Sequence, residues 1–200
     1  MKKLFTGVFV LMVLLSLTIS AEAFDSKSIY RNEGMAAYAG WSEYTDGVDT
    51  YTSIQATTSN DGTDIYVGIW TYNENTGVWS DMWGYMFTQE DVFTIDKKLE
   101  SATLSPVDIE LNACVYDSDA ETYICTGETL TIAAQWTGEG NFMKSSSMSI
   151  FRDNDYFSKY SDKSSFREAT ATGSINEVDL GPSDYGELVK FKSVYTSMEK

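Results

Sequence analysis

Residues 36–88 read AAYAGWSEYTDGVDTYTSIQATTSNDGTDIYVGIWTYNENTGVWSDMWGYMFT, and this pattern predicts four antiparallel β-strands joined by three turns. Asp46-Gly47 is a strong signal for a two-residue hairpin turn. A second turn is expected around Asn60-Asp61-Gly62, and a third across Asn73–Gly77. The expected strands therefore form a meander over 37–44, 49–57, 64–73 and 78–88.

The three turns also predict how the strands pair. The expected cross-strand pairs are Trp41 with Thr52, Ala56 with Ile65, and Tyr72 with Trp79. A slip of one residue would send every side chain to the opposite face, so agreement between the three registers is informative. They do agree, and they gather one set of small and aliphatic residues for a core: Ala37, Ala39, Trp41, Thr52, Ile54, Ala56, Ile65, Val67, Ile69, Met82 and Met86.

The opposite face of the meander is unusually aromatic. We call it the aromatic face, and its aromatic members are Tyr38, Tyr44, Tyr51, Tyr66, Trp70, Tyr72, Trp79, Trp83, Tyr85 and Phe87. One row across it has minimal side chains at Gly40, Ser53 and Gly68 and ends at Trp83. Such a row between two aromatic rows predicts a shallow trough with aromatic walls. Residues 36–88 contain no Lys or Arg.

Three interpretations of the aromatic face stay open. The first is a second core layer, covered by the N-terminal arm or by residues 139–165. The second is a ligand-binding surface. The third is a surface for self-association or for a protein partner. Aromatic planes beside polar groups suit sugar rings, whose C–H faces stack while their hydroxyls form hydrogen bonds. The residues expected to contact a glycan are Tyr51, Tyr66, Trp70, Trp79, Asp81, Trp83 and Tyr85.

The remaining strands are expected to cover the aliphatic side of the meander. Residues 24–34 are interpreted as an arm or short edge segment, and residues 153–165 as a surface loop. Pro106 suggests an edge or a bulge. The sequence thus predicts one all-β domain over 24–200, an antiparallel two-sheet β-sandwich of about 8–10 strands. Its second sheet is assigned to residues 103–136, 147–152, 166–175 and 187–195.

Cys114 and Cys125 are the only cysteines, and they lie symmetrically about Asp119-Ala120. A hairpin centred there places them opposite each other, so a cross-strand disulfide is expected. Such bonds suit non-hydrogen-bonded pairs, which favours a four-residue loop closed by Asp117 and Thr122. A redox role is the weaker alternative, because the spacing is not C-x-x-C.

Acidic side chains gather in the same hairpin loop. Asp117, Asp119 and Glu121 are hard oxygen ligands of the kind that bind Ca²⁺, and they form the best metal candidate in the chain. The competing interpretation is favoured: Asp is common in turns because its side chain bonds nearby amides. No other cofactor is expected.

Residues 1–23 have the features of a secretory signal peptide. Lys2 and Lys3 precede an apolar run over 4–19, and Ala21-Glu22-Ala23 supplies a small-x-small cleavage pattern. The alternative is an uncleaved membrane anchor, for which the run is short. The expected location is therefore extracellular or periplasmic.

The mature chain would be strongly acidic. Removing Lys2, Lys3 and Glu22 from 14 basic and 30 acidic residues leaves 12 and 29, a net charge of −17. Such a surface repels phosphate backbones and anionic lipid head groups. Nucleic acid and, after signal cleavage, the membrane are therefore not expected as partners.

The chain contains no His, which removes Ser-His-Asp catalysis and imidazole zinc sites. A glycoside hydrolase built on paired carboxylates is the enzymatic alternative, and Asp81 beside Trp70 is the place to look for it. The leading hypothesis is a secreted, non-catalytic binding or adhesion module that recognises carbohydrate through the aromatic face. The alternative is a structural subunit of an extracellular or cell-surface assembly.

Overall fold

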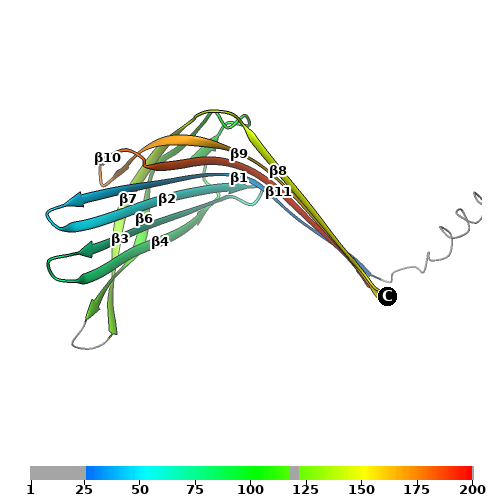
Figure 1. Ribbon diagram of the computed structural model, residues 1–200, viewed down its shortest axis with the longest axis horizontal. Helices are drawn as coiled ribbons and strands as arrows, with labels where there is room; N and C mark the ends of the chain where they lie inside the picture. The colour runs from blue at the N-terminus through cyan, green and yellow to red at the C-terminus, as the bar shows by residue number, and fades with distance from the viewer. Residues whose placement is uncertain (1–25, 118–121, 200) are drawn as a thin grey trace, which may run out of the picture.

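The computed structural model describes residues 26–117 and 122–199, and its regular elements are all β-strands (Figure 1). The eleven strands are β1 (Ser26–Thr45), β2 (Val48–Ser59), β3 (Thr63–Asn73), β4 (Val78–Thr88), β5 (Phe93–Ile95), β6 (Ser101–Asp117), β7 (Thr122–Gly138), β8 (Met143–Arg152), β9 (Tyr156–Ile175), β10 (Val178–Pro182) and β11 (Tyr185–Glu199). The all-β prediction is confirmed. The two-sheet sandwich is not, because every strand belongs to a single sheet. Within the described residues no helix has the length and apolar character needed to cross a membrane.

Eight of the strands close the sheet into a ring. Their order is β9, β11, β1, β2, β3, β4, β6 and β7, and β7 pairs back onto β9. All of these pairings are antiparallel, while β5 adds to β6, and β8 and β10 add to β9. Closure removes free strand edges over the paired stretches, of which the shortest are Ser80–Gly84 of β4 with β6 and Ile132–Gly138 of β7 with β9.

The predicted meander registers are confirmed. Trp41 pairs with Thr52, Ala56 with Ile65, and Tyr72 with Trp79. The first turn is the expected two-residue Asp46-Gly47 turn, with φ of 52° and 82°. Positive φ at both central residues is the geometry that makes Asp-Gly favourable there.

The core fills the ring and is built from the face that the sequence predicted. The aliphatic side of the meander is buried against inward residues of β6 and β7, including Leu111 and Ile132 at 0% exposure. Trp136 is the largest fully buried side chain. Its indole Nε1 donates a hydrogen bond of 2.9 Å to the Tyr38 carbonyl on β1. The C-terminal half therefore covers the meander as expected, but as part of the same sheet.

The ring closes at β9, which pairs with β11 up to Glu168 and with β7 and β10 beyond it. We call this place the seam. Glu168 pairs with Glu187 of β11, and the next residue, Ala169, pairs with Gly138 of β7. The loop before β11 bonds across this seam, since the Asp184 amide donates to the Gly40 carbonyl at 2.9 Å. The indole of Trp41 donates to the Gly181 carbonyl at 3.0 Å.

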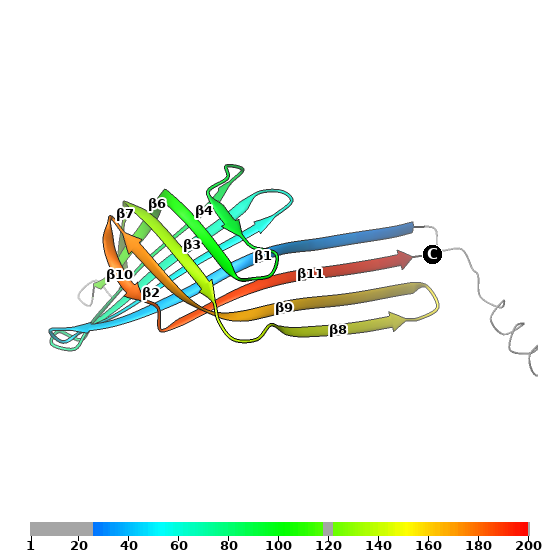
Figure 2. The same ribbon diagram turned by 90° about the horizontal axis from the view of Figure 1, so that it is seen from above.

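Four strand segments leave the ring together and form a flat projection (Figure 2). We call it the extension; it consists of residues 26–33 of β1, 189–199 of β11, 156–168 of β9 and 143–152 of β8. Two predictions are corrected here. Residues 26–34 pair with β11 and are not an arm, and residues 156–165 form a strand and not a loop. Pro106 lies at a register shift between Leu104 and Val107, as expected.

The predicted disulfide is confirmed. Cys114 and Cys125 are bonded across β6 and β7 with a Cα–Cα distance of 4.1 Å, the close approach typical of a non-hydrogen-bonded pair. Asp117 pairs with Thr122, which is the predicted closing pair. The four positions between them lie outside the described residues. A disulfide is compatible with an oxidising, extracellular compartment.

Replacing both cysteines by serine is expected to lower the free energy of unfolding by roughly 2–3 kcal/mol, because the bond restricts the unfolded chain around a short loop. Urea denaturation of the double variant and of the oxidised protein measures the difference. An unchanged midpoint would contradict the expectation.

Candidate functional site: an exposed aromatic face

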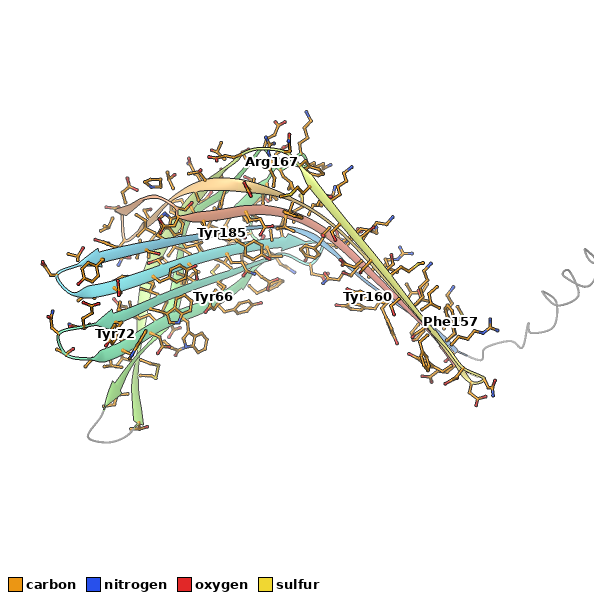
Figure 3. All side chains as sticks on the ribbon, viewed as in Figure 1. Tyr66, Tyr72, Phe157, Tyr160, Arg167 and Tyr185 are labelled. Carbon is orange, nitrogen blue, oxygen red and sulfur yellow. A yellow bond between two sulfur atoms is a disulfide. The ribbon has the colours of Figure 1, made fainter. Side chains whose placement is uncertain are left out.

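The aromatic face lies on the outside of the ring, and the described residues do not cover it (Figure 3). Figure 3 labels Tyr66 and Tyr72 on this side of the meander. The strongly exposed aromatic members are Tyr44, Tyr51, Trp70, Trp79, Trp83, Tyr85 and Phe87, each at 36–61% exposure. The interpretation as a second core layer beneath the arm or residues 139–165 is therefore wrong for this part of the chain.

The predicted trough is filled by two of the aromatic side chains that were expected to form its walls, Tyr51 and Trp70. A Cβ added at Gly40 would lie 2.5 Å from the Tyr51 hydroxyl, so the Tyr51 ring reaches over that glycine. A Cβ at Gly68 would collide with the indole of Trp70. The two rings are 5.7 Å apart between centroids. The glycines thus seat flat aromatic rings, and this row is a continuous aromatic surface and not an open trough.

Two phenols on this surface are held by carboxylates. The Tyr85 hydroxyl donates to Asp64, and the Tyr44 hydroxyl donates to Glu74 at 2.9 Å. These hydrogen bonds raise the pKa of both tyrosines, because a nearby carboxylate disfavours the phenolate. Each hydrogen bond favours one orientation of its ring, and the raised pKa keeps both phenols protonated further into the alkaline range.

Strand β4 presents the most accessible indoles. Trp79 stacks on Tyr72 with centroids 4.4 Å apart and an interplanar angle of 29°, yet Trp79 remains 59% exposed. Trp83, four residues further along β4 and on the same face, is 43% exposed. Asp81 lies between them on this face and is half-buried. An apolar platform next to a hydrogen-bond acceptor can stack a ring and bond its hydroxyls.

The surroundings of Asp81 do not supply a second acid. Its cross-strand partners are Trp70 and Cys114, and its neighbours along the face are Trp79 and Trp83. Glycoside hydrolysis requires a partner carboxylate about 5–10 Å away. Among the described residues this register offers none next to Asp81, so the geometry gives the enzymatic alternative no support at this position.

Sequence reasoning missed Tyr185, which lies beside the seven predicted contact residues. It pairs with Gly40 on β1 and is 55% exposed (Figure 3). Its hydroxyl donates to Glu187 at 2.5 Å. Partial burial, followed by this hydrogen bond, raises the pKa of Tyr185 to about 12. The missing signal was the pairing of β11 with β1, which nothing in the sequence specified.

Alkaline titration checks the Tyr185 environment. Between pH 10.0 and about 12 the unfolded chain releases this proton while the folded chain retains it, so this group makes stability fall as pH rises through the window. Tyr185→Phe is expected to remove one late-ionising phenol from the tyrosinate absorbance titration and to flatten that fall. An identical titration curve in the variant would contradict the assignment.

The predicted calcium site falls outside what the structure describes. Asp119 and Glu121 lie in the undescribed loop, and the side chain of Asp117 is likewise not described. Elsewhere in the described chain no group of three or more Cys, Asp or Glu side chains is placed to hold a metal ion. Calcium binding thus stays a prediction from the sequence.

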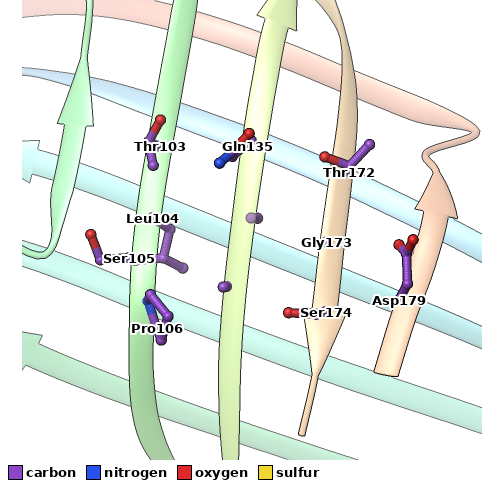
Figure 4. Close-up of a pocket in the computed structure, with 11 residues that line it drawn as sticks. Thr103, Leu104, Ser105, Pro106, Gln135, Thr172, Gly173, Ser174 and Asp179 are labelled. Carbon is purple, nitrogen blue, oxygen red and sulfur yellow. The ribbon is translucent and has the colours of Figure 1, made fainter. Parts of the chain in front are cut away.

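A second candidate surface lies on the other side of the ring, over β6, β7, β9 and β10 (Figure 4). This shallow depression of about 610 Å³ is lined largely by hydroxyl and amide groups, with Asp179 as its one charged residue. Its polar side chains are Thr103, Ser105, Gln135, Thr172, Ser174 and Asp179. It contains no aromatic residue, so the aromatic face offers more for stacking a ligand.

The structure brings the seven predicted contact residues together on one surface. Tyr51, Tyr66, Trp70, Trp79, Asp81, Trp83 and Tyr85 all lie on the outer face of β2, β3 and β4. Comparison with protein-family models, with curated proteins and with solved structures found no match to this chain. The functional argument therefore depends on the geometry of this surface.

Proposed function

We propose that the protein is a secreted, non-catalytic binding module that recognises carbohydrate through the aromatic face. The observation that carries the proposal is the exposure of seven aromatic side chains on one face of a sheet. Exposed apolar patches of this kind commonly mark interaction sites on soluble proteins. The filled glycine row makes the surface flat, which suits an extended glycan chain more than a small molecule in a cavity.

The polar groups of the face fit the same ligand class. Asp81 offers hydrogen-bond acceptors between two exposed indoles, and Gln55 contributes an amide. The absence of Lys and Arg from residues 36–88 favours a neutral glycan over a sulfated or phosphorylated one, since no cation is available to neutralise the anion.

Tryptophan fluorescence tests the proposal. Soluble glycans titrated into the mature chain are expected to change the emission of the exposed indoles, and the double variant Trp79→Ala/Trp83→Ala is expected to lose the response. Val178→Ala is a control for an exposed apolar side chain, because Val178 is 66% exposed but lies on β10, away from β2, β3 and β4. The absence of a response to every glycan in a broad panel would contradict the proposal.

A structural role in an extracellular assembly is the second candidate function. The extension favours it, because all ten residues of β8 are exposed and β9 is the only described strand that pairs with β8. Unpaired edges and open faces are surfaces on which another chain can dock. Light scattering tests this candidate: growth in mass with concentration supports assembly, and a strict monomer opposes it.

A further inference from the structure

The two faces of the extension differ sharply in charge. Strand alternation and the observed pairing place Lys192 opposite Glu33 and Lys163 on one face, and the 2.5 Å ion pair between Lys192 and Glu33 supports that assignment. We call this the cationic face; its charged residues are Lys27, Arg31, Glu33, Lys144, Arg152, Lys159, Lys163, Arg167, Lys190 and Lys192.

Nine of the 12 basic residues of the mature chain are thus gathered on one surface, with Glu33 as its single acid. Apolar side chains lie between the cations, notably Met148 at 63% and Ile150 at 56% exposure. Lysines 159, 163 and 192 surround a shallow depression floored by Ser161, Val194 and Thr196. This face is therefore both positively charged and partly apolar.

The opposite face of the extension continues the aromatic face of the ring. Phe191 lies against Gly34 on this side, and Ser193 bonds Asp162. Its aromatic members are Tyr30, Phe151, Tyr156, Tyr160, Phe166, Phe191 and Tyr195, and its acids are Asp162, Glu168, Glu187 and Glu199. Figure 3 places Arg167 and Tyr160 on opposite sides of the ribbon. No Lys or Arg occupies this face of the extension.

We propose that the cationic face of one copy docks onto the aromatic face of a second copy, so that the protein assembles head to tail. The two surfaces are complementary: lysine and arginine meet a surface that carries Asp49, Asp64 and Asp81 and no cation. Cations attract the faces of Trp and Tyr rings, and methionine packs well against aromatic edges. This inference goes beyond glycan binding and does not depend on it.

The area is sufficient for a specific contact. Four strands about 4.8 Å apart, each about ten residues long at about 3.3 Å per residue, give a face of roughly 600 Å² before side chains are included. A standard interface buries roughly 800 Å² on each partner, so the contact falls near the lower end of specific interfaces. The two surfaces are different, so the contact is heterologous, and copies can keep adding unless the rotation closes a ring.

Sedimentation velocity on the mature chain, residues 24–200, tests the proposal. At about 20 mM NaCl the average mass is expected to rise with protein concentration, and at about 500 mM NaCl the apparent association constant is expected to fall at least about tenfold. The variant Lys159→Glu/Lys163→Glu is expected to remain monomeric, and Lys163→Glu alone is expected to weaken association. Lys98→Glu is the control: it makes the same charge change in the turn before β6 and should leave association unchanged.

A mixing experiment identifies the geometry. Lys159→Glu/Lys163→Glu keeps its aromatic face, and Trp79→Ala/Trp83→Ala keeps its cationic face. Neither should assemble alone, and together they should form a one-to-one pair that does not grow. Circular dichroism and the thermal midpoint confirm that each variant is folded.

Three outcomes would overturn the proposal. Assembly that survives high salt and the lysine variants would indicate pairing through strand edges. Assembly only of like with like would indicate a symmetric contact, and monomers that bind vesicles of phosphatidylglycerol and phosphatidylcholine would assign the cationic face to lipid. Glycan titration of the monomeric lysine variant tests the proposed function separately, so the two can fail independently.

Discussion

Replacing Trp136 with alanine is expected to lower the free energy of unfolding by about 3–5 kcal/mol, the cost typical of removing a buried tryptophan from a core. Trp136 is 1% exposed, and the ring of Phe93 packs edge-to-face on it with centroids 6.2 Å apart. Its neighbours on β6 and β9 are Ala102 and Ala171. Alanines cannot grow into the space that the indole leaves, so a cavity persists inside the ring.

Two further variants separate the contributions. Trp136→Phe retains most of the packing but loses the hydrogen bond to the Tyr38 carbonyl, and we expect it to cost roughly 1–3 kcal/mol. Trp79→Ala removes an equally large side chain that is 59% exposed, and a loss of about 0.5–1.5 kcal/mol is expected, the value of its stack on Tyr72. Equal effects of Trp136→Ala and Trp79→Ala in urea denaturation would show that the interior is not packed as described.

The meander could be predicted from the sequence because local chemistry specifies it. Asp46-Gly47 supports only a narrow set of turn geometries, and each turn fixes the register of its two strands. Period-two alternation then decides which side chains face the core. The same reasoning correctly paired Cys114 with Cys125, since a hairpin relates positions that are symmetric about its turn.

The closure of the ring could not be predicted in the same way. It depends on β9, whose first half pairs with β8 and β11 in the extension and whose second half pairs with β7 and β10. Residues 156–165 carry few aliphatic side chains, so their composition indicated a loop. Residues 156–165 are half-buried or exposed and none is fully buried, so this half of β9 lacks the apolar alternation by which strands are recognised.

The candidate surface was predicted in part. Alternation placed the seven contact residues on one face, but it gave no information on rotamers, and the rings of Tyr51 and Trp70 lie across the glycines. The cationic face was missed although its alternation is visible in the sequence, for example in residues 189–192, VKFK. The concentration of positive charge becomes apparent only when the four segments are paired, because each segment contributes just two or three basic side chains.

Gly186→Ala is expected to destabilise the protein by about 1–3 kcal/mol or more, because the added methyl group overpacks the seam of the ring. Gly186 is the second residue of β11 and pairs with Ala39, and a Cβ there would collide with the carbonyl oxygen of Ala169. The colliding atom belongs to the backbone, which cannot rotate away as a flexible side chain can. The clash is therefore relieved only if β9 and β11 separate at the point where the ring closes.

The seam explanation predicts more than a loss of stability. Hydrogen exchange of the amides near Ala169 and Leu188 should accelerate in Gly186→Ala, while the meander around Ile65 and Val67 stays protected. Gly181→Ala is the matched control, since nothing lies within 4 Å of its added Cβ and only its φ of 71° opposes the change. If Gly186→Ala were no more destabilising than this control, β9 and β11 would not approach as closely as the ring requires.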